Sequence, residues 1–228
     1  MFIGAGAGAI VGQGVGLPGI AAIAFAHGLT IMVFVFAYGA VSGGHFNPAV
    51  TIGVLAAGAM RAGEAIGYII SQLVGGVIGA LLLAGVLGGT ATGLGTPALA
   101  HDLALGHTTV TITPAVGFVI EAVLAFFLVT VVLATAVAGR AGNLAPAGDR
   151  HDPDPQHHDG RALTGAPFNP ARALGPMIAT GGLSNAWLYV AAPIVGALAA
   201  AIVHRGIAWL VAQPATAQAR VPASSPAE

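Results

Sequence analysis

The fold is decided by the stretch His45-Phe46-Asn47-Pro48-Ala49-Val50-Thr51-Ile52-Gly53, because a second copy of it occurs later in the chain. The copy reads Pro167-Phe168-Asn169-Pro170-Ala171-Arg172-Ala173-Leu174-Gly175, matches at five of nine positions and lies 122 residues further on. Each copy begins a short apolar stretch, 47–57 or 169–180, that is too short to cross about 30 Å of hydrocarbon and too apolar for an ordinary loop. Such paired segments are typical of inverted-repeat membrane proteins, whose site lies where the repeats meet.

Each copy is a prepared helix start. Asparagine is a favoured N-cap, and proline at the first helical position loses no hydrogen bond. If the two halves enter the membrane from opposite faces, the two helices meet with their N-termini, and two positive dipole ends converge near the midplane. The asparagine amides would then offer N–H groups that a water oxygen can accept and that a cation cannot. The candidate pore residues are Asn47, Pro48, Ala49, Asn169, Pro170 and Ala171.

The composition agrees with a bilayer as solvent. Charged residues make up 7% of the chain against 56% hydrophobic residues, and a soluble domain carries about a quarter charged residues. There is no lysine, and no charged side chain occurs before Arg61. Soluble domains and nucleic-acid binders are therefore excluded, and the absence of cysteine excludes disulfides and thiol chemistry. We expect no catalysis, no cofactor and no metal site, because no nucleophile and base set, phosphate loop or metal box is present.

Four apolar stretches are long enough to span the membrane: 18–41, 63–87, 115–138 and 186–203. The opening stretch 1–12 is too short to span and has no signal-peptide features, so we expect it to be the second half of a truncated helix. The sequence thus predicts one all-α channel domain over 1–212 and a polar tail over 213–228. Its repeats cover 1–87 and 115–212.

Two ionisable residues lie inside apolar segments, where they are costly and by default face water or a partner. Arg172 follows the second copy directly, while its counterpart Val50 is apolar. That asymmetry favours a filter at one mouth of a pore; an arginine snorkelling at a helix end is the alternative. Glu121 lies alone in the stretch 115–138.

The stretches Ser42 to Thr51 and Asn169 to Arg172 resemble the major intrinsic protein family, the aquaporins, and the resemblance covers Phe2 to Arg205. It implies six tilted transmembrane helices, two half-helices, one pore per subunit and a homotetramer. Ions and protons are excluded in aquaporin-type pores by the electrostatic barrier of the half-helix dipoles and an arginine.

The resemblance also implies a selectivity filter of His27, Ala166 and Arg172, by their distances from the two copies. This set is similar to the filter of plant tonoplast intrinsic proteins, in what is otherwise a bacterial-type member. It would pass water and other small neutral solutes such as ammonia, urea or hydrogen peroxide, whereas Ala173 argues against glycerol. A histidine packed between helices is the alternative for His27. By the same resemblance, Glu121 and His45 support the loops that lead into the two copies.

The arginines predict the orientation. In the six-helix layout Arg61, Arg140, Arg205 and Arg220 fall on one side, and the connection 88–114 has no arginine. By the positive-inside rule both termini are cytoplasmic, in a multi-pass protein of the cell (inner) membrane.

The stretch 147–161 does not fit this layout, which needs a fifth crossing there. It holds six of the chain's fifteen charged residues, and each would cost about 2.5 to 3.5 kcal/mol at the bilayer centre. A back-translation of 149–155, shifted by one nucleotide, reads Ile-Gly-Met-Thr-Leu-Thr-Leu. We therefore infer that about fifteen residues are read out of frame, so that His157, at the fifth-helix filter position, is not a filter residue.

Two other interpretations of this stretch stay open. Its side chains could form a metal-binding or pH-sensing loop, as histidine-rich tracts can, or it could be a solvated linker. The residues concerned are His151, Asp152, Asp154, His157, His158 and Asp159.

The sequence therefore predicts a passive channel for water and small neutral solutes. The alternatives are an ion-coupled secondary transporter, which needs intramembrane acids and has Glu121 as its one strong candidate, and a truncated chain that does not conduct.

Overall fold

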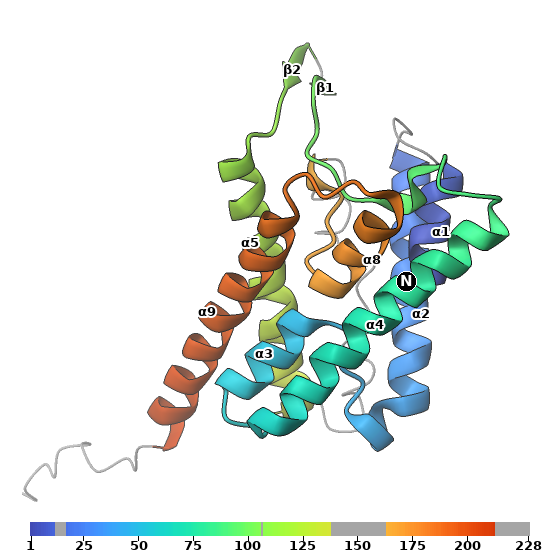
Figure 1. Cartoon of the computed structure of the whole chain (residues 1–228). Helices are drawn as coiled ribbons and strands as arrows, with labels where there is room; N and C mark the ends of the chain where they lie inside the picture. Colours follow the sequence, from blue (N-terminus) through green and yellow to red (C-terminus); the bar gives the residue numbers. More distant parts are fainter. Residues whose placement is uncertain (12–16, 106, 138–162, 213–228) are drawn as a thin grey trace, which may run out of the picture.

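The computed structural model describes residues 1–11, 17–105, 107–137 and 163–212. Within these ranges four helices are long and apolar enough to cross a membrane, which confirms the predicted all-α membrane fold (Figure 1). They are α2 (Leu17–Ser42), α4 (Ala62–Val86), α5 (Pro114–Val132), which continues into the π-helix η2 (Leu133–Val137), and α9 (Ala186–Ala212). Only α9 differs clearly in length from its predicted span, which ended at residue 203. It runs nine residues further, past His204 and Arg205, through the second apolar stretch 207–212.

Among the described residues, three shorter apolar helices accompany these four: α1 (Phe2–Val11), α3 (Pro48–Ala56) and α8 (Pro170–Thr180). The last two begin one residue after the asparagine of each sequence copy. Figure 1 shows α3 and α8 in opposite halves of the molecule, with their first residues toward the middle. Proline occupies the first position of both helices, where its missing N–H is not needed.

The long connection between α4 and α5 contains structure that the sequence did not predict. A short 3-10 helix, η1 (Gly93–Gly95), is followed by the antiparallel strands β1 (Leu103–Leu105) and β2 (Thr108–Val110). This hairpin projects beyond the start of α5 (Figure 1). Leu99 and Ile112, on either side of it, are buried against Leu188 and Tyr189 of α9, so the hairpin has an apolar anchor.

The helices approach one another at glycines. The α4 helix crosses α8 where Gly76 faces Ala171 and Gly175, and a Cβ atom on Gly76 would lie 2.5 Å from the Ala171 carbonyl oxygen. A second close approach joins α5 to α9, at Ala122 and Gly196. Small residues let helix backbones come together in lipid, where association depends on van der Waals packing rather than on the hydrophobic effect.

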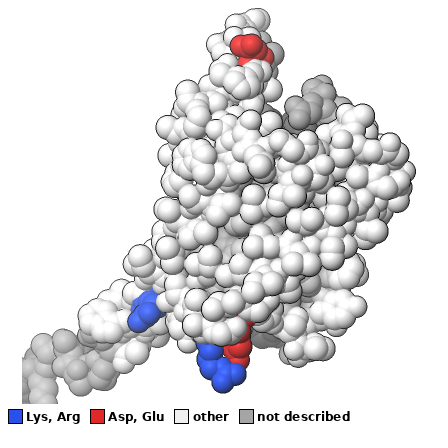
Figure 2. All heavy atoms as spheres, in the orientation of Figure 1, with Lys and Arg blue, Asp and Glu red and all other residues white. Residues whose placement is uncertain are grey.

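On the face that Figure 2 shows, charged side chains lie at the two ends of the molecule and none lies across the middle, whereas Glu121 and Arg172 are buried inside. Arg61 pairs with Glu64 at the start of α4, and Arg205 Nη1 donates to the Ala56 carbonyl at the end of α3, 3.2 Å away. Asp102 lies in the hairpin connection. The two described arginines outside the α8 segment therefore share one end of the molecule.

Several sequence predictions concern residues outside the described ranges. These are Arg140, Arg220, the stretch 147–161 with its three interpretations, and the tail 213–228. The described residues that flank the stretch lie near opposite ends of α5. Val137 ends the π-helix, whereas the Leu163 carbonyl accepts a hydrogen bond of 2.8 Å from the amide of Ala100, beside the hairpin.

Candidate pore site

The two asparagines cap the two half-helices. Asn47 and Asn169 have extended backbone angles, with φ of −146° and −143°. The Oδ1 atom of Asn47 accepts from the amide of Ala49 at 2.9 Å, and that of Asn169 accepts from Ala171 at 3.0 Å and from Arg172 at 3.2 Å. Each side-chain oxygen is thus occupied, so the amide nitrogen points away from its own helix.

The amide nitrogens bond across the two repeats. Asn47 Nδ2 donates to the Phe168 carbonyl at 3.0 Å, and Asn169 Nδ2 donates to the Phe46 carbonyl at 2.9 Å. Each asparagine is therefore fixed by the residue that precedes the other asparagine. The structure brings the two sequence copies together with their helix starts opposed. Each asparagine amide has two N–H donors, and the bond to the other repeat uses one of them.

Close packing explains why glycine recurs at the ninth position of each copy. A Cβ atom on Gly53 of α3 would collide with the Val129 side chain, and one on Gly175 of α8 would collide with the Gly76 carbonyl. The two glycines occupy equivalent places in the two copies, where each half-helix packs closely on a transmembrane helix.

The loop before Asn169 has a strained backbone that polar side chains hold. Ala166 and Phe168 have positive φ angles of 38° and 25°, which cost energy in residues other than glycine. Glu121, fully buried in α5, accepts from Thr164 Oγ1 at 2.6 Å and from the Phe168 amide at 2.7 Å. The Tyr189 hydroxyl donates to the Thr164 carbonyl at 2.9 Å. The carboxylate thus lies where it can fix the loop that enters the second half-helix.

The loop before Asn47 is held from α4. Gln72 Nε2 donates to the His45 carbonyl at 2.5 Å and to Thr51 Oγ1 at 3.0 Å, and the Tyr68 hydroxyl donates to the Ser42 carbonyl. The His45 ring lies against Tyr68, with 5.3 Å between ring centroids. His45 therefore contributes its carbonyl and its ring to the packing of this loop.

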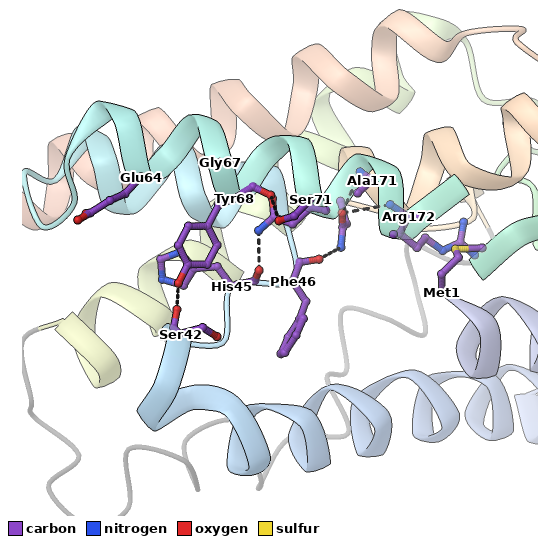
Figure 3. Close-up of a pocket in the computed structure, with 14 residues that line it drawn as sticks. Met1, Ser42, His45, Phe46, Glu64, Gly67, Tyr68, Ser71, Ala171 and Arg172 are labelled. Atoms are coloured by element: carbon purple, nitrogen blue, oxygen red, sulfur yellow. Dashed lines mark hydrogen bonds between the residues drawn. The ribbon is translucent and has the colours of Figure 1, made fainter. Parts of the chain in front are cut away.

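Arg172 lines a cavity of about 670 Å³ between α4, the loop before α3 and the start of α8 (Figure 3). Its side chain is 8% exposed. Asn169, Gln72 and Met1 line the same cavity. A buried guanidinium beside a cavity can donate hydrogen bonds to a neutral solute and repel a cation.

The other two predicted filter residues lie elsewhere. The His27 ring packs on Gly4 of α1, and its Nδ1 lies 3.1 Å from the Ile23 carbonyl of its own helix. Ala166 is buried with Leu124, Ala125 and Phe168. Neither residue lines the cavity at Arg172, so the structure does not bring the three together there. Tertiary packing of α1 on α2 decides which way His27 faces, and distance along the sequence does not report it.

Three residues of the site were not identified from the sequence: Gln72, Thr164 and Tyr189. A signal existed for Gln72, which is an amide inside an otherwise apolar span and needs a partner at that depth. Thr164 and Tyr189 have no comparable signal, because their bonds depend on how α5 and α9 pack.

The described residues contain no group of three or more His, Asp or Glu side chains that could hold a metal ion. The histidine-rich stretch 147–161 lies outside this statement.

The chain is similar to known channel proteins over most of its length. The family model described as Major intrinsic protein matches residues 1–204. Aquaporin TIP4-2 of Zea mays is 35% identical over 205 residues, which cover 89% of this chain and 76% of that protein. The glycerol uptake facilitator protein-like 6 of Lactiplantibacillus plantarum is 37% identical over 191 residues, covering 82% and 84% of the two chains.

A solved structure shows the same fold. The X-ray structure of the aquaglyceroporin from Plasmodium falciparum superposes with a TM-score of 0.75 at 20% identity and covers 92% of both chains. With the family match and the opposed half-helices, this means that the chain belongs to the major intrinsic protein family, as a multi-pass membrane channel for water or small solutes and not an enzyme.

Proposed function

We propose that this protein conducts water, and with it ammonia, urea or hydrogen peroxide, passively through a constriction between Asn47 and Asn169. The observation that carries the proposal is the reciprocal pair of hydrogen bonds from each asparagine to the backbone of the other repeat. These bonds hold two helix starts face to face at one point. A solute passing there meets N–H groups from both halves of the chain.

The electrostatics of this point favour neutral solutes. Each helix N-terminus carries roughly half a positive elementary charge, so two opposed starts repel cations and protons. A water oxygen can accept from the second N–H of each amide. Ion exclusion therefore requires no charged side chain at the constriction itself.

Arg172 is proposed as the filter residue, because it is buried, lines a cavity together with Asn169 and directly follows the second Asn-Pro-Ala box. By resemblance to the family, His27 and Ala166 are proposed for the other two filter positions, and neither of them lines the cavity at Arg172. Ala173, directly after the arginine, is fully buried and argues against glycerol as a preferred solute.

An ion-coupled transporter has less support. It would need a carboxylate that can exchange a coupling ion, and the described membrane region offers Glu121. Both oxygens of Glu121 accept hydrogen bonds that hold the loop into α8. This favours a supporting role for the carboxylate.

Solute flux in proteoliposomes tests the proposal. We expect fast osmotic shrinkage, without a proton or sodium requirement, in vesicles that contain the full chain, together with uptake of urea or ammonia above that of empty vesicles. Shrinkage at the rate of empty vesicles contradicts conduction by the chain as written. Flux that depends on an ion gradient would support the transporter instead.

The assembly and orientation are also proposals. We infer a homotetramer in the cell (inner) membrane with both termini cytoplasmic, on the side of Arg61 and Arg205. Chemical cross-linking in membranes and protease access to the tail 213–228 in oriented vesicles test these two statements.

A further inference from the structure

The two tryptophans of the chain indicate where α9 crosses the two boundaries of the membrane. Trp187 and Trp209 are 57% and 64% exposed and lie near the two ends of this helix. They are 22 residues apart, or about 33 Å along the helix, which is close to the roughly 30 Å of a hydrocarbon core. Because tryptophans gather at membrane interfaces, this spacing places one of them at each boundary.

Arg205 lies one helical turn inside the boundary at Trp209. It precedes Trp209 by four residues, or about 6 Å, and its side chain is exposed. A cation at such a depth needs a partner or water. Arg205 Nη1 donates to the Ala56 carbonyl at 3.2 Å, and this bond uses one of the five N–H donors of the guanidinium.

No acidic side chain among the described residues pairs with Arg205. Glu64 pairs with Arg61. Glu121 is buried in α5, and Asp102 lies in the hairpin connection at the other end of the molecule. Figure 2 shows two basic patches at the end opposite the hairpin, and only one of them has an acidic patch beside it. Within the described part of the chain, the charge of Arg205 is therefore available to an anion.

An apolar groove extends from Arg205 toward the middle of the membrane. It has a volume of about 370 Å³, and its lining residues are Ala56 of α3 and Leu198, Ala201, Ile202 and Arg205 of α9. The α9 residues recur every three or four positions, so they share one face of the helix over two turns, or about 10 Å. Ala201 is buried at the floor of the groove, whereas Leu198 and Ile202 are exposed. A groove with a cation at its outer end and apolar walls below fits a molecule with an anionic head and an apolar tail.

We propose that this groove binds an anionic phospholipid, whose phosphate accepts hydrogen bonds from Arg205 and whose acyl chain lies along Leu198 and Ile202. The planar guanidinium can donate two parallel hydrogen bonds to a phosphate. A second copy of the chain fits this face less well, because its apolar surface would cover the arginine without supplying an anion.

The same guanidinium holds the Ala56 carbonyl at the end of α3, so the bound lipid would be attached to the half-helix that begins after Asn47. The site is independent of which solute the channel conducts.

Quenching of tryptophan fluorescence by brominated lipids tests this site in vesicles that contain the full chain. The reporter is Leu198→Trp, at the inner end of the groove, in a chain that also carries Trp187→Phe and Trp209→Phe. Ile70→Trp in the same background is the matched reporter, because Ile70 is exposed on α4, outside the groove and nine residues after Arg61. Phosphatidylglycerol and phosphatidylcholine, with the same bromines on their acyl chains, are each mixed into unbrominated phosphatidylcholine.

We expect phosphatidylglycerol to quench Leu198→Trp at about a fivefold lower mole fraction than phosphatidylcholine, as expected for one arginine at an anionic lipid surface. The two lipids should quench Ile70→Trp equally. Arg205→Gln should abolish the preference at Leu198→Trp, and Arg205→Lys, which keeps the charge, should retain part of it. Arg61→Gln removes the same charge at the same end of the molecule but outside the groove, and it should leave the preference unchanged.

Equal quenching of Leu198→Trp by the two lipids would overturn the proposal. An equal loss of preference in Arg205→Gln and Arg61→Gln would also overturn it, because it would show attraction to the whole basic end rather than to the groove. Quenching by neither lipid would mean that protein, such as a second copy of the chain, covers the groove. If Arg205→Gln does not fold, sodium chloride replaces it: salt should weaken the preference for phosphatidylglycerol, and a preference that salt does not change contradicts the role of the arginine.

Discussion

Glu121 and Asn47 lie 74 positions apart in the chain and are joined through the backbone of one residue. The Phe168 amide donates to Glu121 Oε2 at 2.7 Å, and the Phe168 carbonyl accepts from Asn47 Nδ2 at 3.0 Å. A carboxylate in α5 therefore positions the asparagine that caps α3 through the backbone of Phe168. The positive φ of Phe168 shows that this arrangement strains the backbone.

Replacing this carboxylate should loosen the site. Glu121→Leu leaves the Phe168 amide and the Thr164 hydroxyl without their acceptor, and each buried loss costs about 1–3 kcal/mol. We expect a lower midpoint of thermal unfolding in detergent and slower osmotic water flux. Ser184→Leu, on the exposed turn before α9, is the control and should change neither measurement. An unchanged midpoint in Glu121→Leu would contradict the supporting role.

A charge at the constriction should admit cations. Asn169→Asp keeps a good N-cap, but it loses the amide that donates to the Phe46 carbonyl and places a carboxylate between two positive helix ends. We expect proton or sodium leakage into vesicles that the original chain keeps closed, read with a pH-sensitive dye. Asn185→Asp, which changes an asparagine in the turn before α9, is the control, and vesicles that contain it should not leak ions. If vesicles that contain Asn169→Asp do not leak ions either, Asn169 is not required for ion exclusion.

Removing the buried guanidinium should widen the range of solutes. Arg172→Val deletes the donor and the charge at the cavity, so larger neutral solutes such as glycerol should pass more quickly relative to water. A decrease of about 1.4 kcal/mol in their barrier raises their flux roughly tenfold. The measurement is the ratio of glycerol to water permeability in proteoliposomes. An unchanged ratio would remove Arg172 from the filter.

Neighbouring glycines on α4 provide a matched pair for packing. A Cβ atom at Gly76 would meet the Ala171 carbonyl at 2.5 Å, whereas one at Gly75 meets nothing within 4 Å. Gly76→Ala should lower stability by about 1–3 kcal/mol, the usual cost of overpacking, and Gly75→Ala should not. The measurement is the midpoint of thermal unfolding of both variants in the same detergent. Equal midpoints would contradict the close contact of α4 with α8 at Gly76.

The coding DNA decides the reading of the stretch 147–161. If the stretch is out of frame, its codons read one nucleotide along should give an apolar segment, and a frame-restored protein should conduct water faster. Codons that cannot give such a segment would end the hypothesis. Zinc binding by the chain as written, measured by calorimetry, would favour the metal-binding interpretation.

The membrane helices could be predicted because hydropathy and length report burial in lipid directly. The starts of α3 and α8 could be predicted because Asn-Pro encodes an N-cap and a first turn locally. The recurrence of Gly53 and Gly175 was visible in the sequence, but its cause, close helix packing, was not.

The contacts that could not be predicted involve partners that no side-chain pattern in the sequence reveals. The acceptors of the Asn47 and Asn169 amides are backbone carbonyls, which every residue has. The packing of His27 on Gly4 depends on how α1 meets α2, which no local pattern encodes. The hairpin of β1 and β2 has strands of only three residues each, too short for an alternating pattern to be recognised.

The reciprocal bonds between the two repeats have a consequence for biosynthesis. The carbonyl that fixes Asn47 belongs to residue 168, so a nascent chain with only its first four helices inserted cannot yet complete the constriction. The constriction between the two asparagines can therefore form only after the second half has been inserted and has bound the first. If the two helix starts exclude ions, as proposed above, translation of the C-terminal half is also the step that completes the ion barrier.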